Sequence, residues 1–451
     1  MSFARRFGIG RNFYFYVAWS TVSLLAPAAF AGSDAPWVGS FTAKHVVAAV
    51  SPDNSFSVLE TLIASANESL HISVYELDNL YIGKAIGDAL DRGVAVTLLM
   101  EGAPIPKLPQ SELYNAKQFA KKGAKVYFYN RAKDNDRNER TFKYFHNKYT
   151  IADGRRVLVG SSNYGKNGHP VETSFGNREW EIVLDDRAAA ELFEEAFQHD
   201  LGLSGEWALY GSSDRYKVDS SYEPDMKTRK GHYEPHLEPQ DAYDVPVKTV
   251  FAPENSLDER AVLGTLNNAE ESVDVEQLNF ETYWGDKPYN PTRETSPLMD
   301  AVLRLARAGK AVRIVLNNDW VFHEPDPKAF ELGSVDLMKL FTHLPETLDE
   351  DPNEGAKPKR DNPTTMEYLN KIAKREGLQL GVRLLNYKRC GLNVLHNKGM
   401  IVDSNITLIS SLNWGESAMK FNREAGVLVK SSSVAHFYSR AFEYDWRCSA
   451  P

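Results

Sequence analysis

The sequence predicts an α/β protein made of two homologous halves, and three observations support this prediction. Short runs rich in β-formers alternate with helix-like segments, a pattern typical of a sheet with helices on its faces. The same order of segments occurs twice, starting at Pro-Asp-Asn-Ser (52–55) and at Pro-Glu-Asn-Ser (253–256). Each copy ends in a similar stretch, HNKYTIADGRRVLVGSSNYG at 146–165 and HNKGMIVDSNITLISSLNWG at 396–415. Self-similarity over this length indicates duplicated domains rather than an array of small repeats.

Each half is expected to contain three helices that alternate with three strands before the quoted stretch is reached. In the first half the helices are expected at 56–69, 84–93 and 111–122, and the strands at 70–77, 94–100 and 125–129. In the second half the helices are expected at 259–272, 298–309 and 365–376, and the strands at 273–280, 311–317 and 381–385. The strands are short and apolar, as in a sheet covered on both faces.

The two halves are expected to span 32–205 and 248–451, with residues 206–247 as an extended linker between them. The linker has little apolar periodicity and is rich in Tyr, Asp, Pro, Glu, Ser and Lys, which is typical of irregular structure. An insertion at 320–364 interrupts the second half. Loops of this length are functional or disordered, and both interpretations stay open: a rim or lid beyond the carboxyl ends of the strands, or disorder.

Residues 1–31 have the layout of a signal peptide. Arg5, Arg6 and Arg11 precede an apolar run that ends in Ala-Phe-Ala (29–31), which fits a cleavage site. We therefore expect export to the periplasm or the medium. An uncleaved membrane anchor is the alternative, because the run is close to spanning length. No later segment is long and apolar enough to span a membrane.

Charge and cysteine content narrow the function further. Lysine and arginine number 52 against 61 acidic residues, a formal charge of −9. Proteins that hold long nucleic acids usually present a basic surface, so nucleic acid is less favoured as a partner than a lipid or a small diester. The two cysteines, Cys390 and Cys448, are candidates for a disulfide in an exported protein, with unpaired buried thiols as the alternative. No Cys/His cluster suggests zinc, and no metal or other cofactor is expected.

The quoted stretches are each expected to form a β-hairpin with a polar cluster at its open end. His146 and Lys148 are two residues apart and so share one face of a strand. Asp153-Gly154 is a turn signal, and the return arm ends in Gly-Ser-Ser-Asn (160–163). The ends of the two arms lie side by side in a hairpin, which gathers a His, a Lys, a Ser and an Asn. The second half repeats the cluster with His396, Lys398, Ser411 and Asn413.

Such a cluster suits the chemistry of a phosphate group. Lysine supplies positive charge, and serine and asparagine supply hydrogen-bond donors. Histidine attacks as a nucleophile or moves protons near neutral pH. Two clusters that face each other across a pseudo-twofold axis would allow a double displacement. One histidine attacks phosphorus, while the other protonates the leaving oxygen and later takes a proton from water or an alcohol.

The pattern HxKxxxxD, followed after six residues by G/S-S-x-N and present twice, resembles the phospholipase D superfamily. The first copy is His146, Lys148, Asp153, Ser161 and Asn163, and the second is His396, Lys398, Asp403, Ser411 and Asn413. Asn-Arg-Glu at 177–179 and again at 422–424 resembles the downstream acidic position that steadies a histidine in this family. The resemblance implies a pseudo-twofold phospholipase D-like fold with one active site between the halves.

The same resemblance assigns the roles of these residues. His146 would be the nucleophile that forms a phosphohistidine, and His396 the general acid and then base. The phosphate would be held by the lysines and asparagines, with the serines hydrogen-bonded near it. Asp153 and Asp403 complete the catalytic motifs, and we expect them to fix local structure. Glu179 and Glu424 would support the histidines.

We therefore expect a phosphoric diester hydrolase that hydrolyses or transfers phospholipid head groups. Its partners would be a phospholipid or another phosphodiester, with peripheral membrane contact, and the protein would be a monomer. A secreted nuclease of the superfamily, a cardiolipin synthase-like phosphatidyltransferase and an inactive lipid- or phosphate-binding member are the alternatives. Among nearby residues, His169 is expected to be exposed in a loop, with a place in the lining of the pocket as the alternative. Trp180 and Trp414 are expected to serve packing.

Overall fold

The computed structural model describes residues 35–105, 107–129, 141–285, 292–318 and 361–450. The predicted signal peptide lies outside these residues, as does the predicted insertion up to residue 360. Asp361 caps helix α9 (Asn362–Glu376), which includes the last residues of the predicted insertion.

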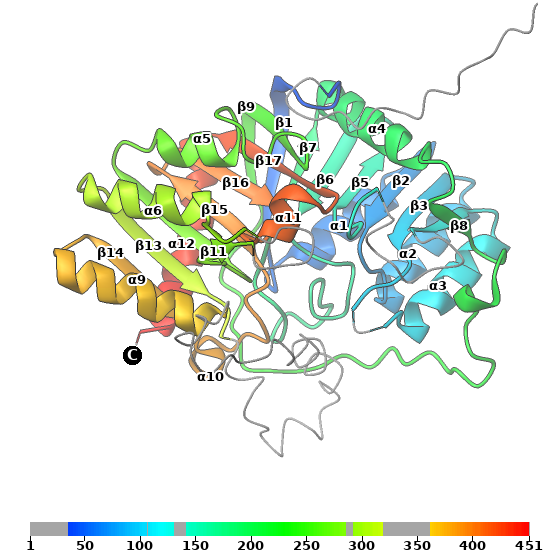
Figure 1. Cartoon of the computed structure of the whole chain (residues 1–451). Coiled ribbons are helices and arrows are strands. Elements are labelled where there is room, and N and C mark those ends of the chain that lie inside the picture. Colours follow the sequence, from blue (N-terminus) through cyan, green and yellow to red (C-terminus); the bar gives the residue numbers. More distant parts are fainter. Residues whose placement is uncertain (1–34, 106, 130–140, 286–291, 319–360, 451) are drawn as a thin grey trace, which may run out of the picture. The chain divides into compact units, whose positions relative to one another are not determined.

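The described residues form one continuous sheet of 15 strands, in which the two halves repeat the same strand order (Figure 1). From the centre outward, the first half runs β1 (Ser40–Ser51), β7 (Glu179–Asp185), β6 (Arg156–Gly160), β5 (Lys148–Ala152), β2 (Ser69–Val74), β3 (Ala95–Glu101), β4 (Lys125–Tyr129) and β8 (Trp207–Leu209). The second half runs β9 (Gln240–Ala252), β17 (Glu424–Lys430), β16 (Ile406–Ser410), β15 (Lys398–Val402), β10 (Ser272–Gln277), β13 (Ala311–Leu316) and β14 (Leu380–Leu384). A separate pair consists of β11 (Tyr283–Trp284) and β12 (Glu294–Thr295). The predicted α/β fold with two homologous halves is confirmed.

The halves join through the antiparallel pair of β1 and β9, in which Phe41 lies opposite Val247. Neither strand was predicted. The start of β9 falls in the segment that we expected to be a linker, where Pro246 and several acidic residues obscure the strand pattern. Elsewhere in that segment lie β8 and a short 3-10 helix, Asp214–Tyr216. Residues 217–239 contain no helix or strand.

Helices cover both faces of the sheet. On one face α4 (Arg187–Leu201) and α12 (Ser432–Cys448) share a single core cluster, so this core belongs to both halves. On the other face each half has its own cluster. The first is covered by α1 (Ser55–Ala64), α2 (Leu80–Asp91) and α3 (Gln110–Lys121), and the second by α5 (Val262–Asn267), α6 (Pro297–Arg307) and α9. Two short helices, α10 (Tyr387–Cys390) and α11 (Glu416–Lys420), flank the second hairpin.

The strands of the hairpins are buried on both faces, and their side chains alternate between the clusters. Val157 and Val159 point into the shared core, whereas Leu158 points into the core of the first half. This alternation follows from the two-residue period of a strand. It also fixes the face on which the polar residues at the strand ends emerge. Within the part of the chain that the structure describes, no helix meets the length and apolarity needed to cross a bilayer.

Candidate functional site

Both quoted stretches are hairpins, as predicted. Strands β5 and β6 pair with Tyr149 opposite Val159, and β15 and β16 pair with Met400 opposite Leu408. His146 immediately precedes the first hairpin, and Asn163 follows it. The ammonium group of Lys148 donates a hydrogen bond to the carbonyl oxygen of His146, and the second hairpin repeats this bond between Lys398 and His396. Each Lys therefore lies against its His at the open end of the hairpin.

The two hairpins meet, and each histidine is held by the opposite half. The backbone N–H of His146 donates to the carbonyl oxygen of Arg423 at 2.8 Å. The backbone N–H of His396 donates to the carbonyl oxygen of Arg178 at 3.1 Å. The crossed bonds place both histidines in one site between the halves.

The side chains cross in the same way. His146 Nδ1 lies 2.8 Å from Glu424 Oε2, and His396 Nδ1 lies 2.8 Å from Glu179 Oε1. Each Nδ1 is engaged by a glutamate oxygen, and Nε2 is left as the nitrogen that can attack or move a proton. Both imidazoles retain access to solvent, with side-chain exposures of 13% and 16%.

The motif serines hold these glutamates in place. Ser161 Oγ donates to Glu179 Oε2 at 2.6 Å, and Ser411 Oγ donates to Glu424 Oε2 at 2.5 Å. Asn422 adds a bond to Glu424 at 2.9 Å. We expected the serine hydroxyls to bind near the phosphate. In the structure their hydrogens go to carboxylates, so we reassign both serines to the support of the glutamates.

Asn163 and Asn413 lie half-buried at the ends of the return arms. Neither carboxamide oxygen has a hydrogen-bond partner among the described residues. A phosphate would accept hydrogen bonds from the NH₂ groups and not from these oxygens, so the phosphate contacts of the two asparagines stay a prediction.

Two buried arginines anchor the crossed pairs, and sequence reasoning missed their role. Arg178 makes two bonds to Asp445 on α12, at 2.7 and 3.1 Å, and lies 3.5 Å from Asp53. A repeated sequence signal existed, since Asp53 belongs to Pro-Asp-Asn-Ser and Arg178 to the first Asn-Arg-Glu.

The second half repeats this arrangement. Arg423 bonds to Asp200 on α4 at 2.8 Å and to Glu254 at 2.6 Å, and Glu254 belongs to Pro-Glu-Asn-Ser. Both arginine side chains are fully buried. Loss of one partner from such a pair leaves an uncompensated buried charge. The buried ion pairs therefore fix residues 178–179 and 423–424, which contact the two histidines.

Asp153 and Asp403 lie at the turn ends of the hairpins, at the opposite end of each strand from its histidine. Their φ angles are 55° and 51°, a left-handed conformation that aspartate tolerates. Asp153 accepts bonds from the backbone N–H groups of residues 67–69, and Asp403 does the same for residues 270–272. Burial opposes ionisation, but these N–H groups outweigh it and lower the pKa of both carboxyls. Both residues fix local structure, as expected.

Burial sets the charge states within the site. It lowers the pKa of Lys148 and of Lys398 to about 7 each. Burial together with Lys148 and Lys398 lowers the pKa of His146 well below its usual value. Burial also lowers the pKa of His396, but Glu179 opposes this effect.

The glutamates differ as well. Burial alone would raise the pKa of Glu179, but His396 and Lys398 outweigh it and lower the pKa to about 2. Burial raises the pKa of Glu424 to about 8, against the opposing effect of Lys148. The second-half imidazole therefore faces the more acidic carboxyl group of the two, which makes the two histidines electrostatically unequal.

His169 is not an exposed loop residue, and that prediction was wrong. Its side chain is fully buried, with Nε2 2.8 Å from Glu181 Oε1 and Nδ1 3.2 Å from the carbonyl oxygen of Asn163. Glu181 on β7 supplies the polar partner that makes burial possible. On the equivalent strand β17, Gly426 stands opposite Ser410, just as Glu181 stands opposite Gly160. Only the first half therefore carries this buried pair behind Asn163.

Aromatic residues complete the surroundings. Trp180 and Trp414 are fully buried and serve packing, as expected. Tyr75, which sequence reasoning did not single out, lies with its ring centroid 4.8 Å from that of His146. The ammonium group of Lys148 lies 5.3 Å from the same ring. This tyrosine follows directly on strand β2 and packs against the first-half histidine.

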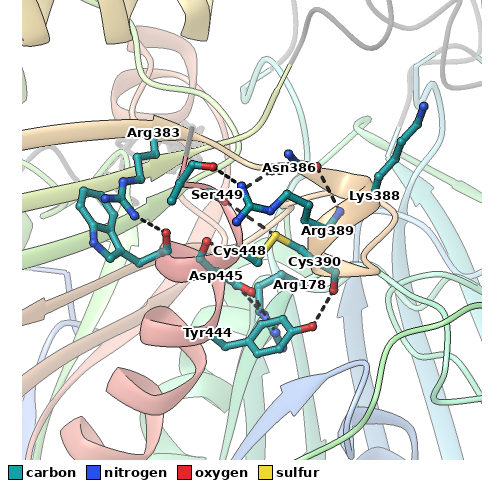
Figure 2. Close-up of a disulfide and its surroundings, with 12 residues drawn as sticks. Arg178, Arg383, Asn386, Lys388, Arg389, Cys390, Tyr444, Asp445, Cys448 and Ser449 are labelled. Atoms are coloured by element: carbon teal, nitrogen blue, oxygen red, sulfur yellow. Dashed lines mark hydrogen bonds and ion pairs between the residues drawn. A yellow bond between two sulfur atoms is a disulfide. The ribbon is translucent and has the colours of Figure 1, made fainter.

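The two cysteines form the candidate disulfide, which ties α10 to the end of α12 (Figure 2). Tyr444 on α12 donates to the carbonyl oxygen of Cys390 at 2.9 Å. Figure 2 also shows Arg178 bonded to Asp445, three residues before Cys448. Residues 391–395 lead from Cys390 to His396. Helix α12 therefore holds both this segment, through the disulfide, and Arg178, whose carbonyl oxygen accepts a hydrogen bond from the backbone N–H of His396.

Comparison with known proteins identifies the relatives of this chain. The family model described as cardiolipin synthase, PLD-like domain, matches residues 59–201 and 262–446. Mitochondrial cardiolipin hydrolase of Xenopus tropicalis is 25% identical over 146 residues, which are 32% of this chain and 60% of the relative. The chain thus spans less than two thirds of the length of that relative.

One solved structure shows the same fold over most of the chain. Phosphatidylserine synthase of Haemophilus influenzae Rd KW20 matches with a TM-score of 0.57 and 12% identity, over 91% of this chain and 88% of that structure. Nuc of Salmonella typhimurium, a phospholipase D family member, matches 37% of this chain and 97% of its own, with 23% identity and a TM-score of 0.31. The duplicated family match covers well over half of the sequence, and the chain therefore belongs to the phospholipase D superfamily, with two PLD-like halves.

Proposed function

We propose that this protein hydrolyses phospholipid head groups through a phosphohistidine intermediate. The observation that carries the proposal is the crossed pair of imidazoles, each held at Nδ1 by a glutamate of the other half. This arrangement orients two Nε2 atoms in one site. Lys148 and Lys398 lie beside these histidines and supply positive charge for the non-bridging phosphate oxygens.

In the first step His146 Nε2 attacks phosphorus, and the bond from phosphorus to the head-group oxygen breaks. His396 gives its Nε2 proton to that oxygen, so the head group leaves as a neutral alcohol. In the second step His396 takes a proton from water while the water oxygen attacks phosphorus. The N–P bond to His146 breaks, which releases the phosphatidic acid and restores both imidazoles.

The unequal surroundings of the two histidines support this assignment of roles. A nucleophilic imidazole must be neutral, and the pKa of His146 is lowered well below its usual value by burial and the two lysines. A general acid must hold a proton; burial lowers the pKa of His396 too, but the ionised Glu179 opposes this effect, so the pKa of His396 is lowered less than that of His146 and His396 is the more easily protonated of the two. Glu179 thus orients the imidazole of His396 and stabilises its protonated form, as the buried aspartate does for the histidine of a Ser-His-Asp triad.

Two considerations favour a phospholipid as the substrate. The chain carries a net charge of −9, which disfavours a long nucleic acid. The relative from Xenopus tropicalis is described as a hydrolase of cardiolipin. Phosphatidyl transfer is the second candidate function, because the matching family description names a synthase. In transfer, an alcohol replaces water in the second step and the residues keep their roles.

We also propose that the protein works after export. The layout of residues 1–31 supports this, and so does a disulfide, which persists in oxidising compartments.

A trapping experiment tests the mechanism. With ³²P-labelled substrate and acid quench, the wild type should carry label at an acid-labile nitrogen, and His146→Asn should carry none. His396→Asn is the matched variant. With a p-nitrophenyl ester, whose leaving group needs no proton, it should accept label but release it slowly. Label on His146→Asn would show that the roles are reversed or that the intermediate is a different one.

A substrate panel tests the substrate class. We expect turnover of phosphatidylcholine, phosphatidylglycerol or cardiolipin, with phosphatidic acid as the product. Ethanol or glycerol added at high concentration distinguishes transfer, because it should divert product to a phosphatidyl alcohol. Cleavage of single-stranded DNA alone would refute the phospholipid proposal and favour the nuclease alternative.

A further inference from the structure

A second cationic site lies on the outer face of α12, apart from the catalytic histidines. There the structure contains a cavity of about 590 Å³. Its cationic and polar lining comprises Arg389, Arg440, Arg447, His236, His436 and Ser439. None of these residues belongs to the motifs. His236 alone contacts the network that holds His396, because its backbone N–H donates to Asp53 at 2.8 Å and Asp53 lies 3.5 Å from Arg178.

The helix itself brings most of these groups together. His436, Arg440 and Arg447 are spaced by four and seven residues, so they lie along one face of α12. Arg389, at the end of α10, is brought to the same cavity because Cys390 beside it is bonded to Cys448. Figure 2 shows Arg389 next to this disulfide.

The positive charge of the cavity is not balanced by its own lining. Glu443 is the one carboxylate among the described residues that line it. Glu443 Oε1 lies 2.5 Å from Arg313 Nη1, and Oε2 lies 3.5 Å from Arg447. Its single negative charge is therefore shared between two arginines, one of which does not line the cavity.

The other two arginines contact only neutral groups in the contacts that the structure gives. Arg440 donates to the carbonyl oxygen of His236 at 3.3 Å, and Arg389 donates to that of Ala450 at 2.5 Å. Carbonyl oxygens fix the orientation of a guanidinium group without neutralising it. Each guanidinium group has five N–H donors, so most of their donors are not used by these bonds.

We propose that this cavity binds a phosphate-bearing anion. Guanidinium groups match the oxygens of a phosphate in paired hydrogen bonds, and several of them around one space favour a group of charge −1 to −2. The volume falls in the range of cavities that hold whole small molecules, so a phosphorylated head group fits as well as a free phosphate. The site differs from the catalytic one and does not depend on the function proposed above.

The test compares Arg440→Ala/Arg447→Ala with the wild type, and uses Arg187→Ala, an exposed arginine on α4, as the matched control. Equilibrium dialysis with ³²P-labelled inorganic phosphate measures binding of the free anion. Sedimentation with vesicles of phosphatidylcholine, with and without 30% phosphatidylglycerol, measures binding of a lipid phosphate. All three proteins carry His146→Asn in the vesicle arm, so that turnover does not alter the lipids.

The double variant should bind about tenfold or more weakly, while the control binds like the wild type. Weakening in the dialysis arm identifies a site for a soluble phosphate, and weakening only with phosphatidylglycerol vesicles identifies a lipid head group. Equal binding by the double variant and the wild type in both arms would overturn the proposal. Circular dichroism verifies folding. If the double variant is unfolded, Arg447→Gln, whose side chain is 80% exposed, replaces it under the same criteria.

Discussion

The crossed glutamates lead to a prediction that would not hold if each glutamate supported the histidine of its own half. Glu424→Gln should impair the chemistry of His146 in the other half of the chain, and Glu179→Gln should impair that of His396. The change from glutamate to glutamine keeps the size of the side chain and removes its negative charge. It therefore tests the hydrogen bond rather than the packing.

The expected magnitude follows from the geometry. Glu424 is fully buried, and its two oxygens lie 2.8 and 2.9 Å from His146 Nδ1. Above about pH 8, where Glu424 is ionised, a hydrogen bond to a charged group contributes about 1.5–3 kcal/mol, which corresponds to about 10- to 150-fold in rate. Ser411 donates to one oxygen of this carboxylate, so a glutamine that keeps this bond turns its NH₂ group toward His146. The hydrogen of the imidazole then moves to Nε2, which blocks attack on phosphorus.

Rapid-quench measurements with a ³²P-labelled p-nitrophenyl phosphodiester separate the two steps. Glu424→Gln should form the phosphohistidine about 10- to 150-fold more slowly than the wild type. Glu179→Gln should form it at close to the normal rate, because this leaving group needs no acid, and should then accumulate it because hydrolysis is slow. The opposite result, with labelling lost in Glu179→Gln and kept in Glu424→Gln, would refute the crossed assignment.

The remaining predictions concern stability, pH and positioning. Asp153→Ala should lower the free energy of unfolding by about 1–3 kcal/mol, because its hydrogen bonds to the backbone are lost, and kcat should not change. A large fall in kcat with no loss of stability in urea titrations would contradict a structural role. Because the pKa of Lys148 is lowered to about 7, a rise in pH through 7 removes the charge of this side chain. KM should therefore rise above pH 7, and Lys148→Arg should shift that rise to higher pH. A wild-type KM that stays flat from pH 6 to 9 would argue against a charged lysine in substrate binding. His169→Leu, which leaves Glu181 without its buried partner, should lower the melting temperature and raise KM more than it lowers kcat, and an unchanged KM would count against its positioning of Asn163. Cys390→Ala/Cys448→Ala opens a loop of 58 residues, so it should destabilise the protein by about 4 kcal/mol; calorimetry that finds no change would show that the bond does not constrain the unfolded chain.

The acid limit of stability provides a check on Glu179 that needs no substrate. Its pKa is lowered from a usual value of about 4.5 to about 2. The stabilisation that it contributes is therefore fully present above about pH 4.5 and is lost as the pH falls toward 2. In Glu179→Gln the unfolding free energy should fall less steeply over this window than in the wild type.

The sequence by itself determined the local parts of the molecule. The hairpins could be predicted because a two-residue strand period and the turn residues at Asp153 and Asp403 set their register over a few positions. The duplicated motif also identified the kinds of side chain in the site. The structure confirmed these hairpins together with the alternation of strands and helices in each half.

Only the tertiary structure decided which partners meet. Glu424 lies 278 residues from His146, and no local pattern shows that it serves the histidine of the other half. The crossing depends on strands β1 and β9, whose pairing joins the halves but whose sequences do not alternate clearly. The burial of His169 likewise depends on Glu181, which a different strand supplies. Register within a hairpin is set by neighbours along the chain, whereas the pairing of charges across the site is set by how two sheets join into one.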